Sequence, residues 1–143
     1  MEIQIAKTPA DFEAMFPVIR ELRPHLSFAD YAALIEESRK RDEYELVAIF
    51  DGANCIAAMG FRILFDFVHG KHLYIDDLVV TEACRSKGVG AELLQYAEKI
   101  AAEKRCKGLR LCTGVDNVGG KKFYEREGWK MRSVVYKKSF EAR

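Results

Sequence analysis

Apolar residues recur along the chain with two different periods, and these periods predict the first secondary-structure elements. Residues 2–7 alternate between polar and apolar side chains, which predicts a short strand. From Pro9 the apolar residues recur every three or four positions, which predicts a helix that has Thr8 as its N-cap and ends before Pro24. The apolar face of this helix consists of Phe12, Met15, Phe16, Ile19 and Leu22. A second helix is predicted over 27–40, with Ser27 as its N-cap and with Tyr31, Leu34 and Ile35 facing inward.

The rest of the chain contains alternating strand-like and helix-like segments. Predicted strands cover 45–50, 55–64, 73–80, 109–113 and 129–137, and predicted helices cover 88–105 and 117–127. Asp51-Gly52, between the first two of these strands, is typical of a hairpin turn. The resulting order, β-α-α-β-β-β-α-β-α-β, predicts an α/β fold with a mixed sheet. Because no repeat, low-complexity tract or linker interrupts it, we expect residues 1–143 to form a single domain.

The overall composition is that of one compact domain and argues against several classes of partner. With 143 residues, of which 49% are hydrophobic, the chain is long enough to bury a sizeable core. Its 23 Lys and Arg nearly balance its 22 Asp and Glu, and the net charge of +1 argues against nucleic-acid binding. No apolar run is long enough to cross a membrane, and the N-terminal segment does not resemble a signal peptide. We therefore expect a cytoplasmic protein with neither nucleic acid nor membrane as a partner.

The four cysteines, Cys55, Cys84, Cys106 and Cys112, show no spacing typical of a zinc site. We therefore expect no metal centre, and we expect reduced thiols that are mostly buried. A catalytic cysteine is disfavoured because no histidine partner is evident in the sequence.

A glycine-containing loop between the predicted strand 73–80 and the following helix is the first candidate ligand site. Its sequence is Arg85-Ser86-Lys87-Gly88-Val89-Gly90. The free N–H groups of a helix N-terminus bind anions, the glycines let a phosphate approach the backbone, and the basic side chains add positive charge. The spacing R-x-x-G-x-G differs from both the dinucleotide fingerprint and the Walker loop. Taken alone, the loop is equally compatible with a turn that binds no ligand.

A second motif begins about 27 residues further along the chain. Asn117 is followed by Phe123-Tyr124 and then by Gly128-Trp129. Asn117 is typical of a helix N-cap, and Gly128 is typical of a helix end in the left-handed conformation. Taken alone, this motif predicts only a capped surface helix whose aromatic pair packs on the core.

Together the two motifs resemble the GNAT superfamily of acetyl-CoA-dependent N-acetyltransferases. The resemblance covers residues 44–137 in element order and is most specific over 73–129. It implies a mixed, mostly antiparallel central sheet flanked by about four helices, with splayed strands that form the acetyl-CoA cleft. Two positions depart from the family pattern: Gly120 stands where the family usually carries Ala, and Trp129 where it usually carries Phe. The two glycines at 119 and 120 are expected to weaken the first turn of that helix by up to ~1 kcal/mol each.

The resemblance also implies which residues hold the cosubstrate, acetyl-CoA. It assigns the pyrophosphate to the Arg85 side chain and to backbone N–H groups of the residues that follow, namely Ser86, Lys87, Gly88, Val89, Gly90 and Ala91. It assigns hydrogen bonds with the pantetheine arm to the backbone of Leu78, Val79 and Val80, in the manner of an added strand. Asn117 is expected to bind the pantetheine or an ordered water, and Tyr124 to lie near the thioester sulfur.

The chemistry of acetyl transfer to an amine supports catalytic roles for three side chains. An alkylamine has a pKa of about 10 and must lose a proton before it attacks. Asp76 and Asp77 are the candidate carboxylates, and because neighbours on a strand face opposite sides, only one is expected to reach the cleft. The family resemblance favours Asp76, whereas Asp77 is equally compatible with a structural pair. Tyr124 is a candidate general acid for the departing thiolate, and the Val80 N–H is the candidate donor to the thioester carbonyl.

Other chemistry-bearing residues are weaker candidates. The three histidines, His25, His69 and His72, are scattered and show no catalytic pattern. A group of aromatic residues is expected mainly in the core, with the lining of an acceptor pocket as the alternative: Phe61, Phe65, Phe67 and Tyr74.

The predicted function is that of an N-acetyltransferase that moves an acetyl group from acetyl-CoA to a primary amine by direct transfer in a ternary complex. A small-molecule amine is the favoured acceptor, and an amine of a protein or peptide is the alternative. The competing hypotheses are a non-catalytic acyl-CoA-binding module and a nucleotide-binding domain that uses the same loop. Exposed strand edges make a homodimer a further expectation.

Overall fold

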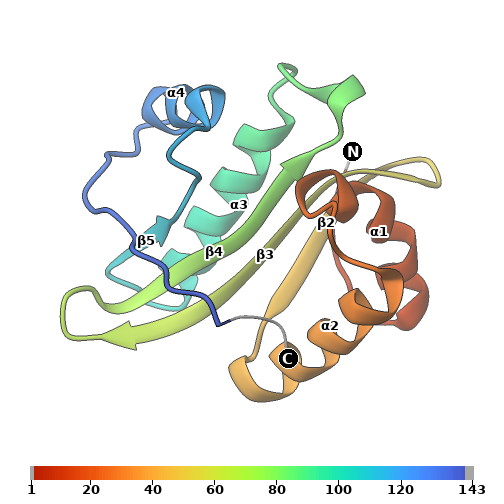
Figure 1. Cartoon of the computed structure of the whole chain (residues 1–143). Helices are drawn as coiled ribbons and strands as arrows, with labels where there is room; N and C mark the ends of the chain where they lie inside the picture. The colour runs from red at the N-terminus through yellow and green to blue at the C-terminus, as the bar shows by residue number, and fades with distance from the viewer. Residues whose placement is uncertain (1, 141–143) are drawn as a thin grey trace. The chain divides into compact units, whose positions relative to one another are not determined.

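The computed structural model describes residues 2–140, and the chain divides into two compact units on either side of the Leu111–Cys112 bond. The first unit contains a five-stranded sheet and the helices α1, α2 and α3, and the second contains α4 (Figure 1). The predicted α/β class with a mixed sheet is therefore confirmed. Among the described residues, no helix has the length and apolar character needed to cross a bilayer.

The observed elements follow the predicted order up to the last helix. They are β1 (Ile3–Ile5), α1 (Pro9–Leu22), α2 (Phe28–Asp42), β2 (Glu45–Asp51), β3 (Asn54–Asp66), β4 (Gly70–Val80), a 3-10 turn (Glu82–Cys84), α3 (Val89–Glu103), β5 (Gly108–Leu111) and α4 (Val118–Arg126). Only the bounds of the predicted elements differ, by a few residues.

Both predicted N-caps of the first two helices form. The Thr8 hydroxyl accepts a hydrogen bond from the Asp11 N–H at 3.2 Å, and the Asp11 carboxylate accepts one from the Thr8 N–H at 3.0 Å. The Ser27 hydroxyl accepts from the Asp30 N–H at 3.1 Å. A cap of this kind stabilises a helix by about 1 kcal/mol, so these local signals fix where α1 and α2 begin.

The sheet has the strand order β1-β2-β3-β4-β5, and all neighbours are antiparallel except β4 and β5, which are parallel. The pairing of β4 with β5 runs only from His72 opposite Gly108 to Ile75 opposite Leu111. No strand of the first unit therefore pairs with the second half of β4 on that edge.

Helices cover both faces of the sheet, with α1 and α2 on one face and α3 on the other (Figure 1). On β2, Leu46 and Ala48 are buried in the core that α1 and α2 cover. Val47 and Ile49 are also buried and point to the opposite face, because side chains alternate along a strand. Both faces of the sheet therefore contribute to the hydrophobic core, and this double burial positions β4 between two packed layers.

The predicted closing strand over 129–137 is wrong. The described residues 129–140 contain no strand, and their large apolar side chains are exposed, for example Met131 at 75% and Tyr136 at 94%. A strand requires a neighbour that pairs with its backbone groups, and no ladder among the described residues includes this segment. Local sequence pattern cannot supply that partner.

The inward orientation predicted for Leu34 is also wrong. Tyr31 and Ile35 of α2 are buried as expected, but Leu34 is 57% exposed. Its side chain lies on the wall of a cavity, which leaves it in contact with solvent.

Candidate active site

A cavity of about 470 Å³ opens between α1, α2 and the sheet. Its apolar wall consists of Ile19, Leu26, Tyr31, Leu34, Ile35 and Leu46. Its polar wall consists mainly of Arg23, Asp42, Tyr44, Arg62, Asp76 and Asp77. The two carboxylates predicted from the sequence therefore line the same cavity.

A β-bulge in β4 explains why Asp76 and Asp77 face the same way. In the pairing of β3 with β4, Gly60 lies opposite Asp77 and Phe61 lies opposite Ile75, so Asp76 is the extra residue. One extra residue shifts the alternation of side chains by one position. The prediction that these two neighbours face opposite sides is therefore wrong.

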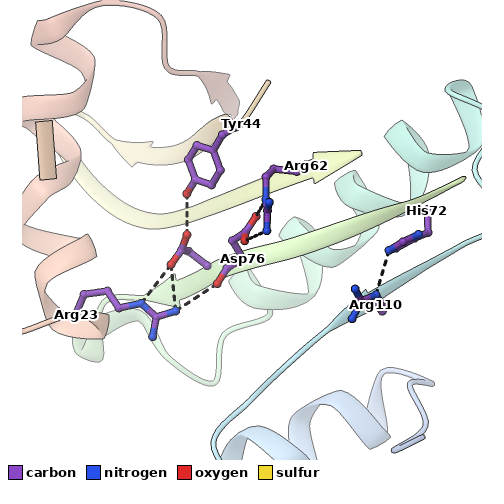
Figure 2. A network of polar contacts seen from close by, with 7 residues as sticks. Arg23, Tyr44, Arg62, His72, Asp76 and Arg110 are labelled. Atoms are coloured by element: carbon purple, nitrogen blue, oxygen red, sulfur yellow. Dashed lines mark hydrogen bonds and ion pairs between the residues drawn. The ribbon is translucent and has the colours of Figure 1, made fainter. Parts of the chain in front are cut away.

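Three donor groups fix the Asp77 carboxylate. Arg23 Nε and Nη2 donate to Oδ1 at 3.2 and 3.1 Å, and Tyr44 Oη donates to Oδ2 at 2.7 Å. Figure 2 shows Arg23 and Tyr44 approaching β4 from different elements. Arg23 Nη2 also donates to the Asp76 carbonyl at 3.2 Å, so the same guanidinium holds the backbone of the bulge. Burial and the adjacent Asp77 carboxylate raise the pKa of Tyr44 well above its ordinary value, which keeps this phenol a donor.

Gly60 provides the space that the Tyr44 ring occupies. A Cβ added at Gly60 would overlap the Tyr44 phenol, so a larger residue would displace the ring from Asp77. Neither Gly60 nor Tyr44 was predicted as a site residue. Their contact depends on the register of β2 and β3, which no local motif encodes.

Asp76 forms a two-point ion pair with Arg62 of β3 (Figure 2). Arg62 Nε donates to Oδ2 at 2.9 Å and Nη2 donates to Oδ1 at 2.7 Å. Burial raises the pKa of Asp76, and the Arg62 guanidinium opposes that shift. Asp76 accepts two hydrogen bonds, one on each oxygen, whereas Asp77 accepts three. With fewer donors and a raised pKa, Asp76 is the carboxylate that we assign as the candidate proton acceptor.

Arg62 was missed in the sequence, although a signal for it exists. It interrupts the apolar run 59–64 of a strand that is otherwise largely buried. A charged side chain at such a position generally has a partner of opposite charge. Arg23 carries no comparable signal, because it lies where α1 ends and a loop begins.

The edge of β4 that faces away from β3 is open at Leu78 and Val80. Pairs in an antiparallel ladder alternate between those that exchange hydrogen bonds and those that do not. The Thr81 N–H donates to the Ile56 carbonyl at 2.8 Å, so Val79 two residues earlier also bonds to β3, opposite Ala58. The expectation that Val79 bonds to the pantetheine therefore needs correction, because its backbone groups are directed to β3. Leu78 and Val80 direct their backbone groups away from β3, toward the edge that no strand of the first unit covers.

The loop that follows β4 ends at the N-terminus of α3. Gly88 is the N-cap residue, has a φ of +82° and provides no side-chain hydrogen bond to the helix. An added Cβ at Gly88 would meet no atom within 4 Å, so the conformation rather than the space favours glycine. The first N–H groups of α3 consequently have no side-chain cap and remain available to an anion.

Arg85 and Glu21 connect this loop to the end of β4 and to α1. Arg85 Nε donates to the Val80 carbonyl at 3.0 Å, and Arg85 Nη2 lies 3.8 Å from Glu21 Oε1. Glu21 also accepts from the Thr81 hydroxyl at 2.6 Å and from the Glu82 N–H at 3.1 Å. These bonds hold the first residues of the loop in place, although most of the loop is exposed.

In the second unit, Asn117 caps α4 as predicted. Its Oδ1 accepts from the Gly120 N–H at 3.0 Å, and its Nδ2 donates to the Thr113 hydroxyl at 2.9 Å. A Cβ at Gly120 would overlap the Asn117 amide, so an alanine there would require this amide to move. Tyr124 contacts the ring of Trp129, and burial raises the pKa of Tyr124, so its phenol stays protonated at neutral pH.

The histidines lie outside this arrangement, except that His25 lines the cavity. His72 is buried; its Nδ1 donates to the Gly70 carbonyl at 2.9 Å and its Nε2 accepts from Arg110 Nε at 3.0 Å (Figure 2). Ligand atoms of Asp66, His69 and His72 lie within 4.8 Å of one another, a grouping that the sequence analysis did not predict. Because the Arg110 guanidinium already uses the His72 lone pair, we assign no metal to this group.

Two further expectations need correction. Phe61 is buried, but Phe65 and Phe67 are exposed, because the end of the β3–β4 hairpin extends past the last residue that pairs with β2. None of the four aromatic residues lines the cavity. Cys112 is exposed and the other three cysteines are partly exposed, because most of them lie at the ends of elements rather than inside them.

Comparison with known proteins identifies the family. A sequence profile described as the acetyltransferase (GNAT) family matches residues 10–129. The uncharacterized N-acetyltransferase YhdJ of Bacillus subtilis (strain 168) is 31% identical over 124 residues, which cover 86% of this chain and 87% of YhdJ. The thialysine N-epsilon-acetyltransferase of Sus scrofa is 24% identical over 135 residues, which cover 78% of this chain and 79% of that protein.

Solved structures show the same fold. A transcriptional regulator from Bacillus halodurans C-125 has a TM-score of 0.86 at 22% identity, with 97% of this chain and 99% of that chain covered. The aminoglycoside N-acetyltransferase AAC(6')-Iy in complex with CoA has a TM-score of 0.81 at 19% identity, with 96% and 95% covered. The chain therefore belongs to the acetyltransferase (GNAT) family, and the resemblance inferred from its motifs is confirmed.

Proposed function

We propose that this protein transfers an acetyl group from acetyl-CoA to a primary amine, in a ternary complex and without an acetyl-enzyme intermediate. A small-molecule amine is the favoured acceptor. The observation that carries the proposal is the open edge of β4 at Leu78 and Val80, which leads directly into the glycine-containing loop and α3. The CoA complex of AAC(6')-Iy, a protein of the same fold, supports the same donor for this chain.

The donor would bind mainly through backbone groups. The pantetheine arm would add to β4 as a strand, with hydrogen bonds to Leu78 and Val80. The pyrophosphate would lie against the N–H groups of residues 86–91, where the helix dipole favours negative charge. Arg85 would add a positive charge beside it, and Asn117 would bind the pantetheine or a water, as the family resemblance implies.

The acceptor would enter the cavity and lose a proton to Asp76, directly or through one water. The neutral nitrogen would then attack the thioester carbon, forming a C–N bond while the C–S bond breaks. The Val80 N–H would donate to the carbonyl oxygen as negative charge develops there. Asp77 would hold the bulge in place through Arg23 and Tyr44 rather than accept the proton.

Tyr124 would protonate the departing CoA thiolate, and the second proton, which the new amide nitrogen loses, would pass through water to the Tyr124 phenolate and restore the phenol. This role rests on the family pattern and on a phenol whose raised pKa keeps the proton in place until the thiolate forms. The family profile spans residues of both units, which supports one functional N-acetyltransferase domain over 1–143. A cytoplasmic location and a homodimer stay predictions of the sequence.

The experiment that tests this proposal combines binding with turnover. Calorimetry should show that CoA binds more tightly than ATP or NAD, and free thiol should appear when acetyl-CoA is mixed with a suitable amine. Tighter binding of ATP or NAD would end the acetyltransferase interpretation. CoA binding without thiol release, with any amine or peptide, would favour a non-catalytic acyl-CoA-binding module.

A further inference from the structure

The charges around the cavity restrict which amines fit it, provided that the proposed function holds. The Arg and Asp side chains of the lining are two guanidinium groups, Arg23 and Arg62, and three carboxylates, Asp42, Asp76 and Asp77. These five groups together carry one excess negative charge. One ammonium group therefore neutralises them.

This excess charge lies near the Asp76–Arg62 ion pair. Arg23 Nη2 lies 3.1 Å from Asp77, and Arg62 Nη2 lies 2.7 Å from Asp76. Asp42, at the end of α2, has no ion-pair partner among the described residues, and its charge acts on both Asp76 and Arg62. Asp42 thus adds a negative charge near the Asp76–Arg62 pair, where the reacting amine is proposed to lose its proton.

A second charged group on the acceptor would find no further unpaired group of opposite charge in the cavity lining. A second ammonium would extend toward the apolar wall, where burying an unpaired charge is unfavourable. A carboxylate on the acceptor would compete with Asp76 and Asp77 for guanidinium groups that are already bonded. Both groups would therefore weaken binding.

The apolar wall of the cavity is suited to hydrocarbon. The first half of α2 contributes Tyr31, Leu34 and Ile35, and the second half contributes Ser38 and Asp42. Leu34 is 57% exposed, so more than half of a large apolar side chain is left uncovered by the protein. An alkyl or aryl group of the acceptor would cover it and remove that apolar surface from water.

We infer that the acceptor is a primary monoamine with an apolar body, such as an alkylamine or arylalkylamine, and neither a polycation nor an amino acid. Its ammonium would lie beside Asp76 and Asp42, and its apolar body would lie along the first half of α2. A cavity of about 470 Å³ accommodates such a molecule as a whole.

Three probes with the same six-carbon chain test this inference: hexylamine, 1,6-diaminohexane and 6-aminohexanoate. They end in a methyl, an ammonium and a carboxylate group, and otherwise present the same primary amine. We expect kcat/KM to be highest for hexylamine, by at least about tenfold over each of the other two. Equal or higher kcat/KM for the diamine or the amino acid would overturn the inference.

The same assay separates failure of this inference from failure of the proposed function. Thiol release with peptides or aminoglycosides but with none of the six-carbon amines would overturn the inference and leave the acetyltransferase standing. CoA binding with no thiol release from any acceptor would overturn the proposed function itself.

Leu34→Asp tests the same inference by changing the cavity wall instead of the acceptor. A carboxylate on the apolar wall should shift the ratio of kcat/KM for diamine over hexylamine upward by at least about fivefold, mainly through KM. Because Leu34 is exposed, the melting temperature should stay close to that of the parent protein. Val68→Asp provides the control, since Val68 is 85% exposed and does not line the cavity. An unchanged ratio in Leu34→Asp, or an equal shift in Val68→Asp, would contradict the inference.

Discussion

The face of β4 that carries Asp76 and Asp77 is built differently from the edge of β4 that carries Leu78 and Val80. On the face, each carboxylate is bonded to side chains from other elements: Arg62 for one, Arg23 and Tyr44 for the other. On the edge, the available groups belong to the backbone, and no strand of the first unit pairs with them. The proposed acceptor side therefore depends on the identity of distant side chains, whereas the proposed donor side depends mainly on where pairing stops.

This difference predicts how the two regions respond to substitution. Backbone groups persist through most side-chain changes, so a donor site of this kind tolerates variation except where conformation requires glycine. A network of side chains loses a bond with each change and leaves a partner unsatisfied. The following substitutions test that contrast.

The largest effect is expected for Asp76→Asn. If Asp76 accepts the proton, turnover should fall by about a hundredfold or more, while the Kd for CoA changes by less than about twofold. Asp77→Asn should instead lower the free energy of unfolding by about 1–3 kcal/mol, because the neutral amide ends the ion pair with Arg23 and keeps only one oxygen that can accept from Arg23 or Tyr44. Steady-state kinetics, calorimetry and chemical denaturation measure these effects. The reverse pattern, with turnover lost in Asp77→Asn and kept in Asp76→Asn, would exchange the two roles.

The raised pKa of Asp76 adds a dependence on pH with a defined sign. Its protonated form is favoured in the folded state, so this stabilising contribution is present below the ordinary pKa of 3.8 and is lost as pH rises through the raised value. Turnover should change in the opposite direction, because only the carboxylate accepts a proton. Turnover that is constant across this acidic range would argue against Asp76 as the base.

Tyr124→Phe is expected to have the next largest effect. Removal of the phenol should lower turnover by about tenfold to a hundredfold and leave acetyl-CoA binding in place. Because burial raises the Tyr124 pKa above 10.0, the parent enzyme should keep this proton donor throughout the neutral and mildly alkaline range. Loss of acetyl-CoA binding together with turnover would indicate a structural role instead.

Gly88→Ala tests the donor side with a smaller expected effect. Alanine at a φ of +82° is strained by roughly 1–2 kcal/mol, and relief of that strain would turn the first N–H groups of α3 away from the pyrophosphate. We expect the Kd for CoA to rise about tenfold. Gly52→Ala is the control, since Gly52 also has a positive φ, of +62°, and also has open space around it. Equal weakening of CoA binding in both variants would mean that the loop has no special role.

Gly60→Ala should disturb the acceptor side with the smallest effect on catalysis. The added Cβ must displace the Tyr44 ring, which we expect to cost about 1–3 kcal/mol of stability and to raise the acceptor KM a few-fold. Gly108→Ala, where an added Cβ meets no atom within 4 Å, serves as the neutral control. Binding of CoA should not change in either variant. A Gly60→Ala protein as stable as the parent would show that Tyr44 is not held in this position.

The same contrast explains what the sequence could predict. The caps at Thr8 and Ser27, the loop before α3 and the cap at Asn117 all depend on neighbours along the chain, and each of the three caps forms as predicted. The bulge at Asp76 depends on the register of two strands, and local alternation therefore gave the wrong orientation for one carboxylate.

Contacts between residues that are far apart in the sequence are the second kind of feature that could not be predicted. Tyr44 and Gly60 meet only after β2 and β3 have paired, so their contact leaves no trace in either segment. Arg62 could have been suspected, because a charge inside an apolar strand requires a partner. The segment 129–137 shows the converse, since a strand-like pattern without a neighbouring strand produced no strand.

Residue-resolved amide hydrogen exchange, measured by NMR with and without CoA, tests most directly whether β4 binds the donor along its open edge. The Leu78 and Val80 amides should exchange at least about tenfold more slowly when CoA is bound, because the ligand then accepts or shields their N–H groups. The Val79 amide should already be protected without CoA and change little, because it bonds to β3. Exchange at Leu78 and Val80 that is unaffected by saturating CoA would contradict the assignment of this edge to the donor.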